Sequence, residues 1–466
     1  MSLRSLIIAA AIALALALAP AASAAGWKQV TASDGANTDQ VSLLRTGDGT
    51  LHVAWRSEDA GGGQSLWHTA IGRDGRIAAT SMVVAGWADI QNPAMVSAPG
   101  GIRMFWGGIR TTNPNETNTA MSTALSPDGG TTWALQEGNV VQDNAQAYAS
   151  PTAAATLPDG TPLQTWYGTN GTWVHSGLTP NTPNFDLQAP LGSYGYLPGI
   201  AVDSGRPVVA WYSSAKDHLG VYAQDVAADG SPIGGAVNMP GTSNMEIGQT
   251  GRTPVAARAG GGLFVAYATG YPSLNRIRVW RVGNAASTLL AKADGGASAT
   301  VAPDANGRLW VVWEDDHGAD PLVFARRSNK AASAWGAVVA ASRPKGSISA
   351  YSVDASALGD STLDVFGSFA LNSGKPLATF TRRILPGLTV VAKGTPRRGR
   401  DAKVEFTVLD AGDPVKGVKV KAGGDSGTSS AKGKVTLTVH AAGGKLTVHA
   451  TAPGYTPAAR TLKVKR

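Results

Sequence analysis

Cysteine is absent from the 466 residues, so disulfides cannot hold this chain together and its stability must come from a buried core. Roughly 440 residues remain after residue 25, which is ample length for such a core. Helix signals are scarce in that part, and no later apolar run approaches the length of a membrane span. Glycine (58) and proline (26) are abundant instead, a composition typical of an all-β chain with many turns.

The first 24 residues have the pattern of a secretory signal peptide. A basic start at residues 1–4 precedes an apolar run at 6–18 and the small residues Ala22-Ser23-Ala24. A retained membrane anchor is the alternative, but the apolar run is shorter than the roughly 18 to 20 residues that a spanning helix needs. The sequence therefore predicts a secreted, extracellular protein with no membrane insertion after cleavage.

Charge divides the chain into two parts. Residues 386–466 carry 15 Lys and Arg against 5 Asp and Glu, whereas the region between the leader and residue 385 carries 24 basic and 27 acidic residues. Such a contrast indicates two domains with different surfaces. We expect a first domain over 25–385 and a basic second domain over 386–466.

A repeat dominates the first domain. Seven times, a turn rich in Gly and Asp leads into a short β-prone strand that ends on an aromatic residue. These aromatics lie 45 to 60 residues apart, close to the period of propeller blades. They are Trp55, Trp106, Trp166, Trp211, Tyr267, Trp313 and Phe366.

Each unit is interpreted as four strands. In the fourth unit we expect strands at 199–202, 207–212, 220–226 and 233–238, with the hairpin turn Asp229-Gly230 before the last. The second strand is apolar on both faces, which suits a sheet packed between two others. The prediction is a seven-bladed β-propeller, with six blades plus an irregular unit as the alternative. Residues 27–30 are β-prone and could complete the last blade.

The second unit contains Ser126, Asp128, Gly130, Thr132 and Trp133 in the pattern Ser-x-Asp-x-Gly-x-Thr-Trp. This resembles the Asp-box, or BNR repeat, of sialidases and related propellers. The resemblance implies a turn between the third and fourth strands, at the blade periphery. Ser and Asp can satisfy backbone donors there and Gly can supply an unusual φ, so the motif is interpreted as structural.

Functional groups in propellers gather where the loops before first strands and after second strands meet at one mouth of the channel. That set is rich in tyrosine, carboxylate and arginine and suits a glycan, although polar residues also populate any exposed loop. Glu314 to His317 could bind a hard cation, but adjacent residues rarely converge on one ion, so neither a metal nor a cofactor is predicted. The candidate ligand-binding residues are Tyr148, Tyr196, Glu314, Asp315 and His317.

The sialidase resemblance implies three arginines on a substrate carboxylate, a tyrosine nucleophile assisted by a glutamate, and an acidic residue as acid and base. The chain departs from the family because the Arg-Ile-Pro element is missing and Glu246 lies only six residues before Arg252. Whether the chain is an enzyme is therefore left open. The candidates for these roles are Arg56, Arg110, Arg252, Tyr351, Glu246 and Asp59.

The second domain shows period-2 alternation, as in residues 435–439, which predicts a small β-sandwich. The segments 417–423, 433–437 and 452–455 resemble bacterial Ig-like or carboxypeptidase-regulatory-like modules. Lys419, Lys421, Lys463 and Lys465 alternate onto one wet face, which would attract an anionic cell-surface polymer or would simply keep the domain soluble. Aromatic residues are missing from this face, so nucleic acid is not expected as a partner.

Three functions follow from these patterns. The first is a secreted propeller that binds carbohydrate or a cell surface at its channel mouth. The second is a glycoside hydrolase of the exo-sialidase type. The third is a protein-interaction propeller.

Overall fold

The fold is taken from a computed structural model of the chain. It describes residues 26–31, 37–110, 120–141, 152–168, 171–242, 252–270, 273–293, 298–315, 323–359, 361–371 and 377–465. The predicted signal peptide lies outside these residues, as do three candidate site residues, Tyr148, Glu246 and His317. No helix of the length and apolarity of a membrane span occurs among the described residues.

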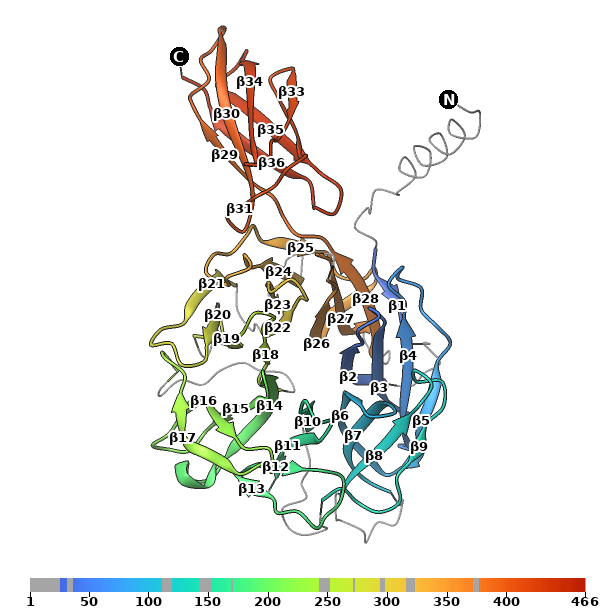
Figure 1. The fold of residues 1–466 in the computed structure, drawn as a ribbon. Coiled ribbons are helices and arrows are strands. Elements are labelled where there is room, and N and C mark those ends of the chain that lie inside the picture. The colour runs from blue at the N-terminus through green and yellow to red at the C-terminus, as the bar shows by residue number, and fades with distance from the viewer. Residues whose placement is uncertain are drawn as a thin grey trace, which may run out of the picture. The chain divides into compact units, whose positions relative to one another are not determined.

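The described residues form two compact units. The larger comprises Gly26–Ile384 together with Asp410–Asp413, and the smaller contains Leu385–Leu409 and Pro414–Arg466. In the larger unit, seven four-stranded antiparallel sheets follow one another around a common centre, a propeller-like all-β arrangement (Figure 1). A single short 3-10 helix, η1 (Ala189–Leu191), occurs among the described residues of this unit.

The sheets of the larger unit follow the chain in order, each from its first to its last strand. They are β2 (Asn37–Arg45), β3 (Leu51–Glu58), β4 (Gln64–Ile71), β5 (Ser81–Trp87); β6 (Asp89–Ala98), β7 (Gly101–Ile109), β8 (Ala120–Ser126), β9 (Ala134–Leu135); β10 (Thr152–Thr156), β11 (Pro162–Gly168), β12 (Gly171–Ser176), β13 (Phe185–Asp186); β14 (Gly195–Asp203), β15 (Arg206–Ser213), β16 (Gly220–Val226), β17 (Pro232–Asn238); β18 (Val255–Ala257), β19 (Leu263–Thr269), β20 (Arg276–Arg281), β21 (Thr288–Lys292); β22 (Ala299–Pro303), β23 (Leu309–Glu314), β24 (Val323–Arg327), β25 (Val339–Ala341); and β26 (Ser347–Ala357), β27 (Leu363–Leu371), β28 (Leu377–Ile384), β1 (Lys28–Gln29).

The second strands carry the core. All seven aromatics that end the repeats are buried, and Trp211, flanked by Val208, Val209 and Ala210, has no exposed surface. Apolar clusters join every pair of neighbouring sheets along the chain. A further cluster joins the last sheet to the first, because Phe366 packs with Trp55. Apolar burial on both faces of each sheet therefore links the sheets in a closed series.

The segment at residues 27–30 completes the last sheet, as its β-propensity indicated. Lys28 pairs with Thr381 and Gln29 with Phe380 in antiparallel register. The backbone N–H of Val30 then donates to Thr379 O at 2.9 Å. The last sheet is therefore built from both ends of this unit.

The motif at residues 126–133 forms the turn between β8 and β9 with the hydrogen bonds its chemistry predicts. The Ser126 hydroxyl accepts from Gly130 N at 2.7 Å, and the Asp128 carboxylate accepts from Thr132 N at 2.9 Å. Gly130 has a φ of 93°, and a Cβ there would lie 1.9 Å from Cε1 of His68. Glycine is required for both the backbone conformation and the close contact.

The smaller unit contains two sheets around one core. The strands are β29 (Thr389–Lys393), β30 (Asp401–Asp410), β31 (Asp413–Pro414) and β34 (Lys434–His440) in the first sheet, and β33 (Asp425–Thr428), β32 (Lys419–Ala422), β35 (Lys445–Thr451) and β36 (Ala458–Lys463) in the second. Val404, Phe406, Val420 and Val448 are fully buried in the core that both sheets share. Exposed and buried residues alternate along β35, as the period-2 pattern predicts.

Candidate ligand-binding site

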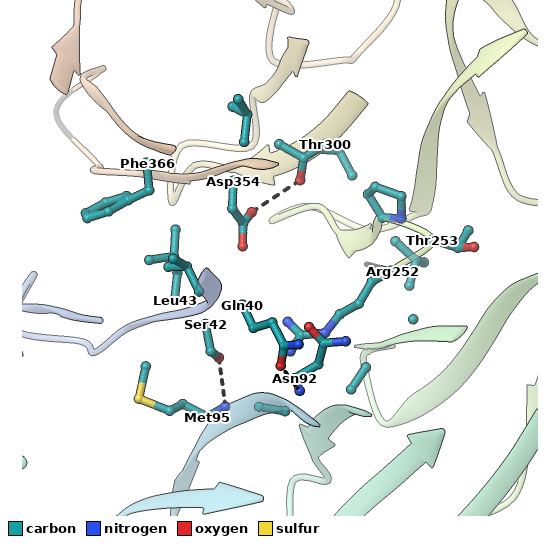
Figure 2. Close-up of a pocket in the computed structure, with 18 of the residues that line it drawn as sticks. Gln40, Ser42, Leu43, Asn92, Met95, Arg252, Thr253, Thr300, Asp354 and Phe366 are labelled. Atoms are coloured by element: carbon teal, nitrogen blue, oxygen red, sulfur yellow. Dashed lines mark hydrogen bonds between the residues drawn. The ribbon is translucent and has the colours of Figure 1, made fainter. Parts of the chain in front are cut away.

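A cavity of about 540 Å³ lies at the centre of the larger unit. The first strand of each of the seven sheets contributes to its wall, so residues from 39 to 367 meet there. Loops and strand starts that are distant in sequence are thereby gathered on a rigid scaffold. Figure 2 shows the polar side chains that face this cavity, among them Gln40, Asn92, Arg252, Thr300 and Asp354.

Arg252 spans the cavity. It precedes β18, and its guanidinium donates a hydrogen bond to Pro93 O of β6. Burial lowers the pKa of Arg252, while the nearby Asp354 carboxylate opposes that shift. A guanidinium remains charged under these conditions, because its ordinary pKa is far above neutrality.

Asp354 of β26 is the acidic group of the same cavity. Burial raises the pKa of its carboxyl group, whereas the Ala355 N–H, Arg252 and Thr300 favour the charged form. The carboxylate accepts hydrogen bonds from Ala355 N at 2.7 Å and from the Thr300 hydroxyl at 3.3 Å. A buried carboxyl with a raised pKa beside a cation is a recurring feature of functional sites.

Irregular backbone surrounds the mouth of the cavity. The pairing register shifts between Asp39 and Ser42, between Gln91 and Ala94, and between Tyr196 and Gly199. Gln40 has a φ of 52°, and its side-chain oxygen accepts from Asn92 N at 2.6 Å. A β-bulge changes the direction in which the side chains of its strand point. The register shifts here turn polar side chains toward the cavity.

Four tyrosines cluster at the end of the larger unit where the first strands begin. Tyr194 and Tyr196 stand at the start of β14, while Tyr167 and Tyr212 stand near the ends of the second strands β11 and β15. The ring of Tyr196 lies 4.6 Å from that of Tyr167, 6.4 Å from Tyr194 and 6.5 Å from Tyr212. In an antiparallel pair the start of the first strand and the end of the second adjoin, so this tyrosine cluster lies at the end where Gln40 and Arg252 lie.

Tyr194 is the accessible member of the tyrosine cluster. It is 48% exposed, one of few large hydrophobic side chains with so much surface in water among the described residues. Its φ of 77° is in the left-handed region, which costs about 1 to 3 kcal/mol for such a residue. Its carbonyl accepts a hydrogen bond from Ser214 N at 2.9 Å, which fixes the unusual conformation.

The three arginines of the sialidase hypothesis do not line one cavity. Arg56 forms a two-pronged ion pair with Asp39 at 2.8 and 2.9 Å. Arg110 instead lies 5.6 Å over the ring of Trp87 on an outer strand and donates to Ser122 and to Gly138 O. Of the three, only Arg252 belongs to the cavity wall.

The remaining candidates are also dispersed. Asp59 is exposed in the β3–β4 turn, where its carboxylate accepts from the backbone N–H groups of Gly61 and Gly63. Glu314 is buried at the end of β23 and accepts from the Ser298 hydroxyl at 2.7 Å, with Asp315 beside it. The backbone of Tyr351 lies in β26, at a register shift between Ala350 and Ser352.

Two features of the site were missed by sequence reasoning. Asp354 and Thr300 lie inside first strands, whereas the sequence search considered the loops. The pairing of Asp39 with Arg56 follows from strand register, since the two residues are opposite each other on β2 and β3. Among the described residues, no group of three or more His, Cys, Asp or Glu side chains is placed to hold a metal ion.

No family model matches the chain, and no curated protein matches it. Solved structures that are similar include a protein of unknown function from Dyadobacter fermentans, with 11% identity over 78% of this chain and 99% of that one and a TM-score of 0.48. A Hadza microbial sialidase has 11% identity over 61% and 65% with a TM-score of 0.45. A polysaccharide lyase has 10% identity over 77% and 92% with a TM-score of 0.49. These likenesses assign no activity to this chain.

Proposed function

We propose that this chain is an exported, seven-bladed, sialidase-like propeller of the Asp-box type that binds carbohydrate at the end of the ring where its first strands begin. An accessory β-sandwich of the Ig-like or carboxypeptidase-regulatory-like kind follows it. Seven sheets joined in a closed series by apolar clusters support the blade number. The Asp-box hydrogen bonds of Ser126 and Asp128 support the class.

The observation that carries the binding function is the tyrosine cluster. An aromatic face is apolar and its phenol is polar, so tyrosine can cover the C–H face of a sugar ring and still bond to a hydroxyl. Tyr194 presents such a face to solvent, supported from behind by Tyr196. The cavity adds hydrogen-bond donors and acceptors, Arg252 and Asp354 among them. Ligand sites commonly combine an aromatic surface, here the tyrosine cluster, with a few convergent polar groups.

The full-length protein, labelled and applied to an array of neutral and acidic oligosaccharides, tests this function. We expect binding to a defined set of glycans and a loss of at least tenfold in affinity for Tyr194→Ala. Ile233→Ala is the matched control, because Ile233 is similarly exposed (53%, against 48% for Tyr194) but lies on the outer strand β17. Equal binding by Tyr194→Ala and the unmodified protein would refute the platform, and binding to no glycan would favour the protein-interaction function.

Hydrolysis of sialosides is a second candidate function, favoured by the positions of Arg252 and Asp354 in one cavity. Arg252 would hold the substrate carboxylate, and Asp354, with its raised pKa, would supply a proton. Turnover of a fluorogenic sialoside by the full chain, lost in Arg252→Ala and partly kept in Arg252→Lys, is the expected result. No turnover, or equal turnover in all three proteins, would eliminate this candidate.

A further inference from the structure

One sheet face of the smaller unit carries basic and hydroxyl side chains and, among the described residues, no acidic ones. Along β32 and β35 the buried and exposed residues alternate, so every second side chain points to solvent, and at the end of β36 the buried Leu462 precedes the exposed Lys463. The exposed set contains Lys419, Lys421, Lys445, His449 and Lys463. We call these five residues the basic face.

Acidic groups lie elsewhere in this unit. Asp425 is opposite the buried Ala422, and its carboxylate accepts from Ser426 N and Thr438 N. Glu405 and Asp401, on the other sheet, pair with Lys434 and His440 respectively. The lysines of the basic face have no ion pair among the described residues, so their charge is not neutralised within this unit.

The strand register places like charges together. Lys445 is directly opposite Lys463, and Lys419 and Lys421 are neighbours on the same face of β32. Opposed like charges destabilise a sheet, so folding alone does not favour this arrangement. Within the pairs Lys419–Lys421 and Lys445–Lys463 the residues are about 5 to 7 Å apart, within one Debye length at physiological salt, whereas Lys445 lies four residues, or about 13 Å, from His449 along β35. The basic face therefore presents two separate lysine pairs, and only an extended anion can contact both.

Hydroxyl groups alternate with these charges. Lys419 is opposite Thr428 on one side and Thr451 on the other, and Thr447 is opposite Thr461 between the lysine rows. Phe, Tyr and Trp side chains, which stack on nucleobases, are absent from the exposed positions of these three strands. A flat surface of cations and hydroxyls matches a polymer that carries acidic groups and many hydroxyls.

We propose that the basic face binds an acidic polysaccharide, independently of the site in the larger unit. The carboxylate or sulfate groups of the polymer pair with the lysines, and its hydroxyls bond to the interleaved threonines. Binding relieves the repulsion between Lys445 and Lys463. Since the attraction is between exposed charges, it weakens with added salt.

The test uses the full chain and immobilised polygalacturonate and dextran sulfate, with neutral dextran, double-stranded DNA and anionic phospholipid vesicles as comparisons. The face variant is Lys445→Gln with Lys463→Gln. The control variant, Lys393→Gln with Lys403→Gln, removes the same charge from exposed positions of the other sheet. We expect at least a tenfold loss of polysaccharide affinity in the face variant, little loss in the control, and weaker binding at 300 mM than at 50 mM salt.

Thermal unfolding provides an independent readout. Removing opposed like charges should leave the melting temperature of the face variant unchanged or raise it, so lost binding would not reflect lost folding. Equal losses of polysaccharide affinity in the face and control variants would show that only the net charge of the protein matters, and would overturn the proposal. Tighter binding to DNA or vesicles than to either polysaccharide, or binding to none of them, would overturn it as well.

Discussion

Replacing His68 with glutamine should make the folding stability less sensitive to acid between pH 7.5 and 5. His68 is buried between the first two sheets, where its Nδ1 lies 3.1 Å from Gly130 O and its Nε2 lies 3.1 Å from Nδ1 of His52. A carbonyl oxygen only accepts, so Nδ1 of His68 carries the proton and Nε2 accepts from His52. A second proton on His68 would remove that acceptor and place a charge in the core.

Burial therefore lowers the pKa of His68 from 6.5 to about 4, with His52 contributing in the same direction. Protonation favours the unfolded chain, so the full stability is present above pH 6.5 and is lost as the pH falls toward 4. Applying the linkage relation to these two pKa values gives a loss of about 2 kcal/mol between pH 7.5 and 5. Asp48 and Asp128, whose pKa values are lowered to about 2, lose their contributions only at lower pH.

Denaturant unfolding at pH 7.5, 6 and 5 measures this loss. In His68→Gln we expect the decrease in unfolding free energy from pH 7.5 to 5 to be smaller than in the unmodified protein by about 2 kcal/mol. His440→Gln is the control, because His440 is exposed and pairs with Asp401 at 3.0 Å, and it should keep most of the original decrease. An identical decrease in His68→Gln and the unmodified protein would refute the assigned environment of His68.

Three further variants test other parts of the fold. Gly130→Ala should lower the melting temperature markedly, because its Cβ would meet the ring of His68 at 1.9 Å; an unchanged temperature would contradict the packing of the β8–β9 turn. Asp128→Ala should lower the denaturant midpoint, since the Thr132 N–H loses its acceptor, and no change would show that the turn does not depend on this carboxylate. Asp364→Ala should cost about 3 to 5 kcal/mol, because Asp364 is buried and pairs with Arg45 of the first sheet at 2.7 Å; a cost below 1 kcal/mol would contradict that pair.

Strand positions were predictable where turn residues mark both ends. Strand β16 has the bounds expected from the sequence, Gly220–Val226, and the alternation predicted at 435–439 lies within β34 (Lys434–His440). The turns Asp229-Gly230 and Gly433 supply positive φ at recognisable residues. Strand β14 begins four residues earlier than expected, because Tyr194 and Leu197 adopt positive φ without a glycine to signal it.

The candidate site was less predictable, because it depends on register and on partners distant in sequence. Arg56 was expected at the channel mouth as a substrate clamp, but the pairing of β2 with β3 places it opposite Asp39. The Arg110 guanidinium packs over the ring of Trp87 on the neighbouring sheet, a contact that the sequence does not reveal. Asp354 follows the alternation of a long first strand, so its position facing the cavity emerges only once the seven sheets are assembled.

Closure of the series of sheets through the N-terminal strand is the central claim, and an introduced disulfide tests it most directly. Lys28 and Thr381 are paired across β1 and β28, and paired residues in antiparallel strands have Cα separations that suit a disulfide. A chain with no other cysteine cannot mispair them internally. Lys28→Cys with Thr381→Cys should form an intramolecular disulfide on mild oxidation, and the loop it closes should raise the unfolding free energy by up to about 5 kcal/mol over the reduced form. Two free thiols after oxidation, or disulfides only between molecules, would contradict the closed arrangement.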